Sequence, residues 1–342
     1  LLKHIQIAQR AISARNTVQI LDGILFEAKA GLLHLSSTDL EIGIHTQVPC
    51  LIEEEGKAVI KGSLIGNIVR KLPQEAVYIE TVHNQMEIRC KNSEFKLVGY
   101  LPEEYPELMA VKEEFSMQIT GKDWKRAIRQ TIFATSQDDT KPVLRGVLFD
   151  ITKEGIFVVA LDGFRISLKK MLMPAEEEQG FIIPARALNE IQKITDDDQM
   201  VQIIANKGNM SFSFGDTIVY TRLLEGQFIQ YQNILQTDTS LVFETKRKDL
   251  YDAMERASLL SGEERANLVK LHLAEGACVI TSNTDIGHVY EKVEGTIQGD
   301  TLEIAFNARY LLDGLKEIEA EDVIMSFSGP LKPLIIESQD EQ

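Results

Sequence analysis

The hydrophobic pattern between residues 115 and 237 changes its period several times and predicts a series of strands and helices. Apolar residues recur at helical spacing in 121–136 and 184–194, and the first of these stretches collects Trp124 and Ile128 on one face. Alternating or β-rich runs with turn residues between them predict strands at 115–119, 143–152, 155–161, 164–172, 200–205, 209–214 and 217–224. The segment therefore predicts an α+β unit in which two helices lie on antiparallel sheet.

Two turn residues, Asp162 and Gly163, separate two of these predicted strands. Asp tolerates a left-handed backbone and bonds to nearby backbone amides, and Gly adopts a positive φ without steric cost, so the pair is typical of a hairpin. The same carboxylate is also a candidate active-site group. The composition of the turn favours a local hydrogen-bonding role for Asp162.

The pattern occurs three times along the chain. Asp39 and Asp285 lie 123 positions before and after Asp162. The same offset relates other segments: Lys61, Pro184 and Asn307, and Ile65, Leu188 and Leu311. One register held over the whole chain indicates tandem repeats. We predict three copies of the unit, at residues 1–114, 115–237 and 238–342. Compared with the second copy, the first lacks its opening strand and the third lacks its closing strand.

Composition places the chain among globular proteins. Of its 342 residues, 44% are hydrophobic, and no run reaches the roughly 18 apolar residues that a membrane-spanning helix needs. The opening segment is mixed and amphipathic, unlike a signal peptide. Cys50, Cys90 and Cys278 are odd in number and widely spaced, which favours neither a disulfide framework nor a zinc site. We expect a soluble, cytoplasmic protein.

The residue types that carry enzyme chemistry show no catalytic spacing. The 6 His residues form no HxH or HExxH pair, and the GxxxxGK[ST], GxSxG and GxGxxG motifs are absent. The acidic runs at 53–55, 176–178 and 196–198 are candidate cation ligands, but such runs in loops are usually solvated. The sequence therefore predicts no enzyme, no cofactor and no metal site.

Positive charge gathers on the predicted helices, although the formal net charge is −16. Spacings of three and four bring Lys122, Lys125, Arg126 and Arg129 onto one side of the helix at 121–136. The other helices repeat this trend with Lys3, Arg10 and Arg15; Arg70 and Lys71; Arg186 and Lys193; Lys246, Arg247, Lys248 and Arg256; and Arg309 and Lys316. A single basic helix face is usually an ordinary solvated surface. Its repetition on six helices indicates that positive charge is concentrated on the helices of this acidic protein.

The triplicated unit, its basic helices and five motifs carry a resemblance to a known family. The motifs are "SQDDTKPVLRGVLFD", "ALDGFRIS", "LLEGQFIQYQNIL", "ERASLLSGEERANLVKL" and "FNARYLLDGL". Together they resemble the bacterial β sliding clamps, the processivity subunits of replicative DNA polymerases, over essentially the whole chain. The resemblance implies three clamp-fold domains per chain and a head-to-tail homodimer that forms a ring around duplex DNA.

The resemblance implies a sequence-independent DNA surface and a dimer interface. Its positions at or near DNA are Arg15, Arg70, Gln137, Lys141 and Arg186, to which charge alone adds Lys125, Arg129 and Arg247. Its interface positions are Phe95 and Leu97 of one chain against Leu259 and Leu260 of the other; periodicity alone would make these ordinary core residues. Because a closed ring holds DNA by topology, a net charge of −16 is compatible with this role, whereas it argues against a protein that coats DNA.

The resemblance also implies a hydrophobic cleft that binds short linear peptides of polymerases, the clamp loader and repair proteins. Its matching positions are Leu144, Leu161, Gly163, Phe164, Arg165, Ile166 and Gln236. Leu161 and Phe164 stand where the family commonly has Thr and His, and Gln236 replaces a usual Pro. The strand that supplies the opposite wall in the family falls beyond Gln342.

Two other functions compete with a DNA-encircling clamp. A protein-binding scaffold of the same clamp fold would not encircle DNA. A hydrolase would use the repeated residues Asp39, Asp162 and Asp285, although catalysis rarely needs one carboxylate three times.

Overall fold

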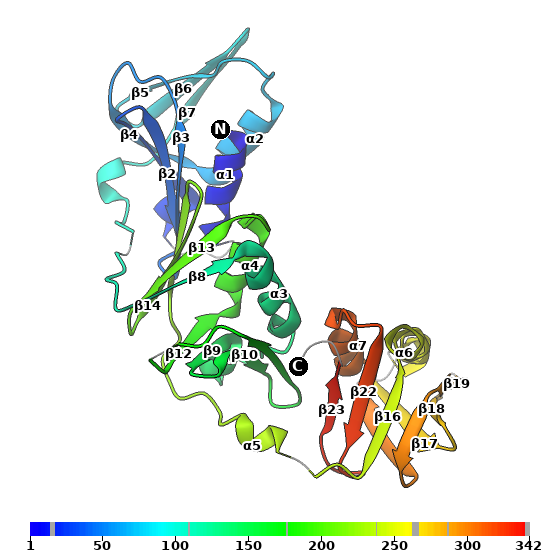
Figure 1. Cartoon of the computed structure of the whole chain (residues 1–342). Coiled ribbons are helices and arrows are strands. Elements are labelled where there is room, and N and C mark those ends of the chain that lie inside the picture. Colours follow the sequence, from blue (N-terminus) through cyan, green and yellow to red (C-terminus); the bar gives the residue numbers. More distant parts are fainter. Residues whose placement is uncertain are drawn as a thin grey trace. The chain divides into compact units, whose positions relative to one another are not determined.

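The computed structural model describes residues 1–13, 18–108, 110–175, 177–236, 238–261, 267–285 and 287–338. These residues form two compact units. The first comprises 1–128, 138–149 and 180–226, and the second comprises 129–137, 150–179 and 227–342. Figure 1 traces the chain through both units.

The first unit is built on an eight-stranded antiparallel sheet (Figure 1). Its strands, in spatial order, are β4 (Gly56–Lys61), β1 (Gly23–Lys29), β2 (Leu32–Thr38), β3 (Ile42–Pro49), β15 (Thr217–Arg222), β14 (Asn209–Phe214), β13 (Met200–Ala205) and β8 (Phe115–Thr120). A three-stranded sheet follows the order β5 (Tyr78–Val82), β6 (Gln85–Cys90), β7 (Ser93–Val98). The helices are α1 (Leu2–Ala8), α2 (Gly62–Lys71), α4 (Ala185–Ile194) and most of α3 (Gly121–Ile132).

The pairing of β3 with β15 joins two predicted copies into one sheet. These strands run antiparallel, with Ile42 opposite Thr221 and Thr46 opposite Thr217. β3 belongs to the first predicted copy, and β15 closes the second. A backbone ladder between copies fixes their register, since a slip by one residue would turn every side chain to the other face.

Among its described residues, the second unit contains two four-stranded sheets and three complete helices. One sheet has the order β20 (Thr296–Gly299), β16 (Leu241–Lys246), β22 (Asp322–Phe327), β23 (Leu334–Glu337). The other has the order β19 (Gly287–Glu294), β18 (Ala277–Thr284), β17 (Leu268–Ala274), β21 (Leu302–Asn307). The helices are α5 (Gln232–Leu235), α6 (Arg247–Ser261) and α7 (Ala308–Glu317).

One further sheet contains the strands where the chain passes between the units. Its order is β11 (Ile166–Met171), β10 (Gly155–Leu161), β9 (Gly146–Thr152), β12 (Gln179–Pro184). The hairpin predicted around Asp162 is confirmed, because β10 and β11 pair antiparallel up to Leu161 opposite Ile166. Its loop is wider than a two-residue turn, and Gly163 supplies the positive φ of +98° that the loop requires.

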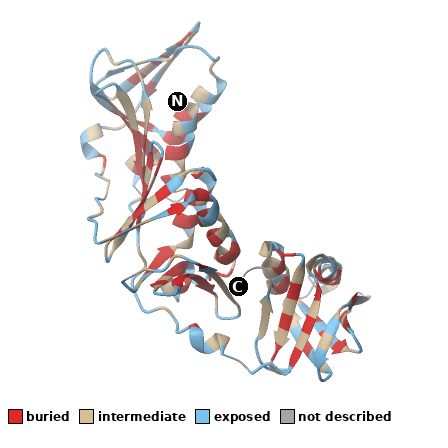
Figure 2. Ribbon diagram, viewed as in Figure 1, coloured by how far each residue is buried: buried red, intermediate tan, exposed pale blue. Residues whose placement is uncertain are grey.

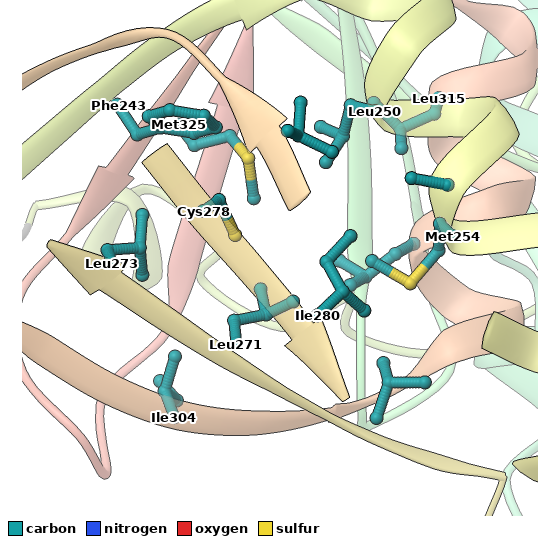
Figure 3. Close-up of a cluster of buried hydrophobic side chains, with 14 of the residues drawn as sticks. Phe243, Leu250, Met254, Leu271, Leu273, Cys278, Ile280, Ile304, Leu315 and Met325 are labelled. Atoms are coloured by element: carbon teal, nitrogen blue, oxygen red, sulfur yellow. The ribbon is translucent and has the colours of Figure 1, made fainter. Parts of the chain in front are cut away.

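The apolar positions of the sequence form the cores of both units. In Figure 2 buried residues alternate with less buried ones along strands such as β16, β17 and β22, as expected for sheets covered on one face. Phe243, Leu250 and Met254 pack with strand residues such as Leu271 and Met325 in the second unit (Figure 3). Trp124 is fully buried in the first unit, which confirms the predicted apolar face of α3.

Several sequence-based boundaries were wrong in detail. The strand predicted at 143–152 begins at Gly146, because Pro142–Arg145 form a short 3-10 helix. Strand β12 was not predicted, because its apolar residues run directly into the helix that follows. Pro184 precedes α4 instead of opening it, since the residue is extended, with φ −54° and ψ 130°. The helix predicted over 121–136 ends at Ile132. None of the helices in the described ranges is long and apolar enough to cross a membrane.

Candidate functional site

A cavity of about 640 Å³ lies in the second unit, and it contains most of the predicted peptide-binding residues. β11 forms one wall, and β23 with α7 forms the other. Both strands are the outer members of their sheets, so each presents an edge that no strand of its own sheet covers. The cavity can therefore bind an extended peptide through apolar side chains and through backbone groups.

The lining is largely apolar, with charged groups at its margins. The apolar side chains are Phe133, Leu161, Phe164, Ile166, Leu168, Ile234, Phe306, Leu311, Ile318, Ile324, Leu334 and Ile336. Lys169 and Lys170 follow along β11, and Glu317 and Glu337 lie on the opposite wall. Such a surface suits apolar anchor residues of a ligand, with polar groups fixing its orientation.

Asp162 organises the turn that leads into this wall. Its Oδ1 accepts hydrogen bonds from the backbone N–H groups of Phe164 at 2.9 Å and Arg165 at 3.0 Å. The corresponding Oδ1 of Asp39 accepts from Glu41 at 3.1 Å and Ile42 at 2.9 Å. Two copies of the repeat therefore use the carboxylate in the same way, which confirms the local hydrogen-bonding role predicted for these two residues.

Arg165 connects this turn to Phe133, the residue that follows α3, and to α7. Its guanidinium donates to Asp162 at 3.0 Å, to Asp313 at 2.7 Å and to the backbone carbonyl of Phe133 at 2.7 Å. The same group lies over the rings of Phe133 and Tyr310, at 5.3 and 4.7 Å from their centroids. Only 18% of the side chain is exposed. Arg165 therefore holds the walls of the cavity in position.

The predicted peptide-binding residues fall into two groups. Leu161, Gly163, Phe164, Arg165 and Ile166 line the cavity, and Phe164, 81% exposed, stacks on Tyr310 with ring centroids 6.0 Å apart. Leu144 is buried in the first unit and Gln236 is exposed beyond α5, and the described lining includes neither.

Sequence reasoning missed the α7 side of the cavity. The motif "FNARYLLDGL" contributes Phe306, Tyr310 and Leu311 to the lining. The sequence signal that could have identified these residues is the position of the motif at the start of the second helix of the third copy.

The predicted DNA-contacting residues are spread over several helices, and most are exposed. Arg70 lies in the last turn of α2, Arg186 in the first turn of α4, and Gln137 and Lys141 in the segment after α3; all four are exposed. Arg15 lies outside the described residues.

Several of these cations have acidic partners within the chain. Lys125 pairs with Asp197 at 2.6 Å, Arg129 with Glu317 at 3.2 Å and with Glu319, and Arg186 with Asp39. The Arg247 guanidinium donates to the carbonyls of Ala320 and Leu315, at the end of α7. Such partners lower the positive potential that these side chains offer to an external anion.

The predicted interface residues lie near strand edges. Phe95 and Leu97 are on β7, the outer strand of its sheet, and both pack on the core of the first unit, where Leu97 is 8% exposed. Leu259 and Leu260 are near the end of α6, which contacts the outer strand β19; Leu259 is 72% exposed. Across the ranges that the structure describes, no group of three or more His, Cys, Asp or Glu is arranged to hold a metal.

Comparison with known proteins identifies relatives along the whole chain. Family models for the N-terminal, central and C-terminal domains of the DNA polymerase III beta subunit match residues 1–109, 118–230 and 232–342. The beta sliding clamp of Bacillus subtilis is 31% identical, covering 100% of this chain and 94% of the relative. That of Staphylococcus epidermidis is 33% identical, covering 97% of this chain and 92% of the relative.

Solved structures give the same result. The crystal structure of the DNA polymerase sliding clamp from Bacillus subtilis superposes with a TM-score of 0.96 at 31% identity, covering 100% of this chain and 94% of that chain. The DNA polymerase III beta chain from Streptococcus pneumoniae gives a TM-score of 0.95 at 27% identity, covering 99% of this chain and 93% of that chain. These similarities confirm the predicted α+β clamp fold.

Proposed function

The chain belongs to the DNA polymerase III beta subunit family, and on this basis we propose that it is a sliding clamp that encircles duplex DNA as a head-to-tail homodimer. The observation that carries this proposal is the match of family domains along the entire chain, in the order in which the internal repeat occurs. Clamps of this kind are non-catalytic processivity subunits that tether the replicative polymerase. We assign the chain three clamp domains, at 1–114, 115–237 and 238–342, and place it in the cytoplasm.

Strand edges support ring closure by two chains. β7 and β19 are outer strands of their sheets. β7 carries Phe95 and Leu97, and β19 contacts α6, which carries Leu259 and Leu260. An exposed strand edge is a template for pairing with another chain. If β7 of one chain meets the β19 and α6 side of a second, the two-fold axis repeats the contact, and both ends are satisfied in a closed ring.

The inner surface of the ring binds DNA weakly and without reading sequence. Arg70, Lys125, Arg129, Gln137, Lys141, Arg186 and Arg247, together with Arg15, are the residues that we assign to phosphate contacts. Phosphate contacts position a duplex but carry no base information. The internal partners of Lys125, Arg129 and Arg186 moderate their charge, which suits a ring that slides.

The cavity between β11 and β23 binds the partner proteins. An extended peptide with leucine or phenylalanine anchors fits its apolar lining, and Lys169 and Lys170 suit an acidic residue beside the anchors. The replicative polymerase, the clamp loader and repair proteins are the partners that we expect to carry such peptides.

Light scattering of the purified protein tests ring closure. We expect a particle with twice the mass of one chain at micromolar concentration, and a monomer at all concentrations would contradict the ring.

A clamp-fold scaffold that does not encircle DNA is the alternative. It predicts peptide binding in the cavity, but DNA retention that does not depend on whether the DNA is circular.

A further inference from the structure

Two histidines, neither of which is assigned to DNA or peptide binding, meet on the sheet of the first unit. His34 lies on β2 and His45 on β3, 11 positions apart in the sequence. Their strands are antiparallel neighbours, with Ser36 opposite His45 and His34 opposite Gln47. The two histidines are therefore diagonal neighbours on one face of the sheet.

This face of the sheet is partly open to solvent. Leu35, between His34 and Ser36, points into the core with Phe26 and Ile60. Thr46, next to His45, is fully buried and bonds to His4 of α1 at 2.9 Å. Because neighbouring residues of a strand point to opposite faces, His34 and His45 project from the other face, and both are half-buried.

The spacing of the two rings matches that of ligands on one metal ion. Nδ1 of His34 and Nε2 of His45 are 3.4 Å apart, and the ring centroids are 5.3 Å apart. Two imidazole nitrogens at about 2.0–2.1 Å from a tetrahedral zinc ion lie roughly 3.3–3.4 Å apart, with their ring centres about 5.2 Å apart. Both separations therefore agree with chelation of one ion.

A hydroxyl group orients one of the two ligands. Nδ1 of His45 is 3.0 Å from the hydroxyl of the buried Ser36. The tautomer in which this Nδ1–H donates to Ser36 leaves the lone pair of Nε2 directed toward His34. Hydrogen bonds of this kind to the second ring nitrogen orient metal-binding histidines.

The charges around the pair allow a cation to bind. A histidine binds zinc through the lone pair of a neutral ring. Glu27 lies on β1, opposite His34 of β2. Its carboxylate pairs with the ammonium group of Lys57 on β4 at 3.1 Å and neutralises the charge of Lys57.

We propose that His34 and His45 bind one zinc ion on this face of the sheet. Zinc takes the place of the proton between the rings: the proton on Nδ1 of His34 moves to Nε2, so that both imidazoles stay neutral. Because no third His, Cys, Asp or Glu of the described residues completes the group, water fills the remaining positions. The ion ties β2 to β3, the strand that joins the first copy to the second through β15.

Zinc titration of the untagged, chelator-stripped full-length protein tests the site. A chromogenic zinc indicator measures competition, and thermal unfolding measures stabilisation. We expect one zinc per chain with micromolar affinity and a higher unfolding midpoint. His34→Asn and His45→Asn should each weaken binding by at least about tenfold and abolish the zinc-dependent midpoint shift. His272→Asn, which changes a half-exposed histidine of the second unit, is the matched control and should leave both unchanged.

Ser36→Ala keeps both ligands and removes the hydrogen bond that orients His45, so about tenfold weaker binding is expected even though the fold is intact. The midpoint of each variant without zinc shows whether it folds. Absence of micromolar zinc binding by the wild-type chain would overturn the proposal. Binding that survives unchanged in both His34→Asn and His45→Asn would overturn it as well, because the ion would then lie elsewhere.

Discussion

At the scale of single residues, Asp162 links a local turn to the cavity. Its two carboxylate oxygens accept hydrogen bonds from different groups. Oδ1 accepts from two backbone N–H groups of the turn, and Oδ2 accepts from the guanidinium of Arg165. Arg165 in turn reaches Asp313 on α7. Asp39 repeats the backbone bonds, but its Oδ2 accepts from Arg186 of α4. The shared turn and the different arginines show that a repeated residue can keep its local role while its long-range partner changes.

Asp162→Ala should lower the free energy of unfolding by about 2 kcal/mol, because two backbone N–H groups and one guanidinium lose their acceptor. Urea unfolding measures this change. Asp139→Ala is the matched control, since Asp139 forms an exposed ion pair with Arg145 and its side chain is 84% exposed; a change within about 0.5 kcal/mol is expected there. Equal effects of the two substitutions would show that the turn of Asp162 contributes nothing specific.

Glu190 gives the first unit a stability that depends on pH. Burial alone would raise the pKa of this carboxyl, but hydrogen bonds from Lys193 and Arg10 outweigh burial and lower it from its ordinary value of 4.5. A carboxyl whose pKa is lowered by folding stabilises the folded state above its unfolded pKa, and that contribution disappears as the pH falls through the lower folded pKa.

Glu190→Gln should therefore cost on the order of 1 kcal/mol at pH 7, and the difference from wild type should vanish as the pH falls below 4.5. Urea unfolding at several pH values measures it. Glu154→Gln, on the exposed turn before β10, controls for the loss of a charge. A difference that grows toward acid pH would contradict the predicted sign.

At the scale of elements, the free edge of β11 matters most. β11 occupies in the second copy the place that β3 occupies in the first, and β3 is paired by β15. Among the described residues, no strand pairs with β11 on the side of the cavity. The same repeat thus makes an inter-copy sheet in one place and, in the other, the cavity wall to which we assign peptide binding.

Phe164→Ala should weaken binding of a short synthetic peptide with leucine and phenylalanine anchors about tenfold, because Phe164 lines the cavity and is 81% exposed, so its loss spares the core. Fluorescence anisotropy measures the affinity. Leu172→Ala is the matched control, since Leu172 follows β11, is 75% exposed and is outside the described lining. Unchanged affinity in Phe164→Ala would place the peptide elsewhere.

Leu259→Lys should shift the protein from dimer to monomer, because it puts a desolvated charge into the apolar contact assigned to the end of α6. Leu259 is 72% exposed in the single chain, so the substitution leaves the core intact. Sedimentation velocity reports the state. Leu51→Lys changes a fully exposed leucine far from the assigned contact in sequence and should stay dimeric. A dimeric Leu259→Lys protein would mean that the interface lies elsewhere.

The sequence predicted elements well where period and turn chemistry agree. β8, β10, β13 and β14 lie within a residue of their predicted bounds, because each is an alternating or β-rich run of residues. β12 was missed because no turn separates "GFII" from the helix after Pro184. The cavity was predicted only on the β11 side. Tyr310 and Phe306 join it through contacts between sheets and helices, which no spacing along the chain specifies. The His34–His45 pair depends on the register in which β2 pairs with β3.

At the scale of the whole molecule, we assign weak DNA contacts to the basic residues and retention on DNA to the closed ring. A net charge of −16 opposes tight binding to DNA. Asp197, Glu317 and Asp39 form ion pairs with basic residues of the helices and lower the positive potential that these residues offer to DNA. A protein of this kind cannot hold DNA by counterion release alone, so retention has to come from a closed ring.

Retention on circular DNA tests this claim most directly. The protein is loaded onto a nicked circular duplex by the clamp loader of its own cell, separated from free protein by gel filtration in high salt, and the DNA is then cut once. The account predicts that the protein stays with the circle and leaves within minutes of the cut, because an open end lets a ring slide off. Equal retention on circular and linear DNA, or none on either, would contradict encirclement.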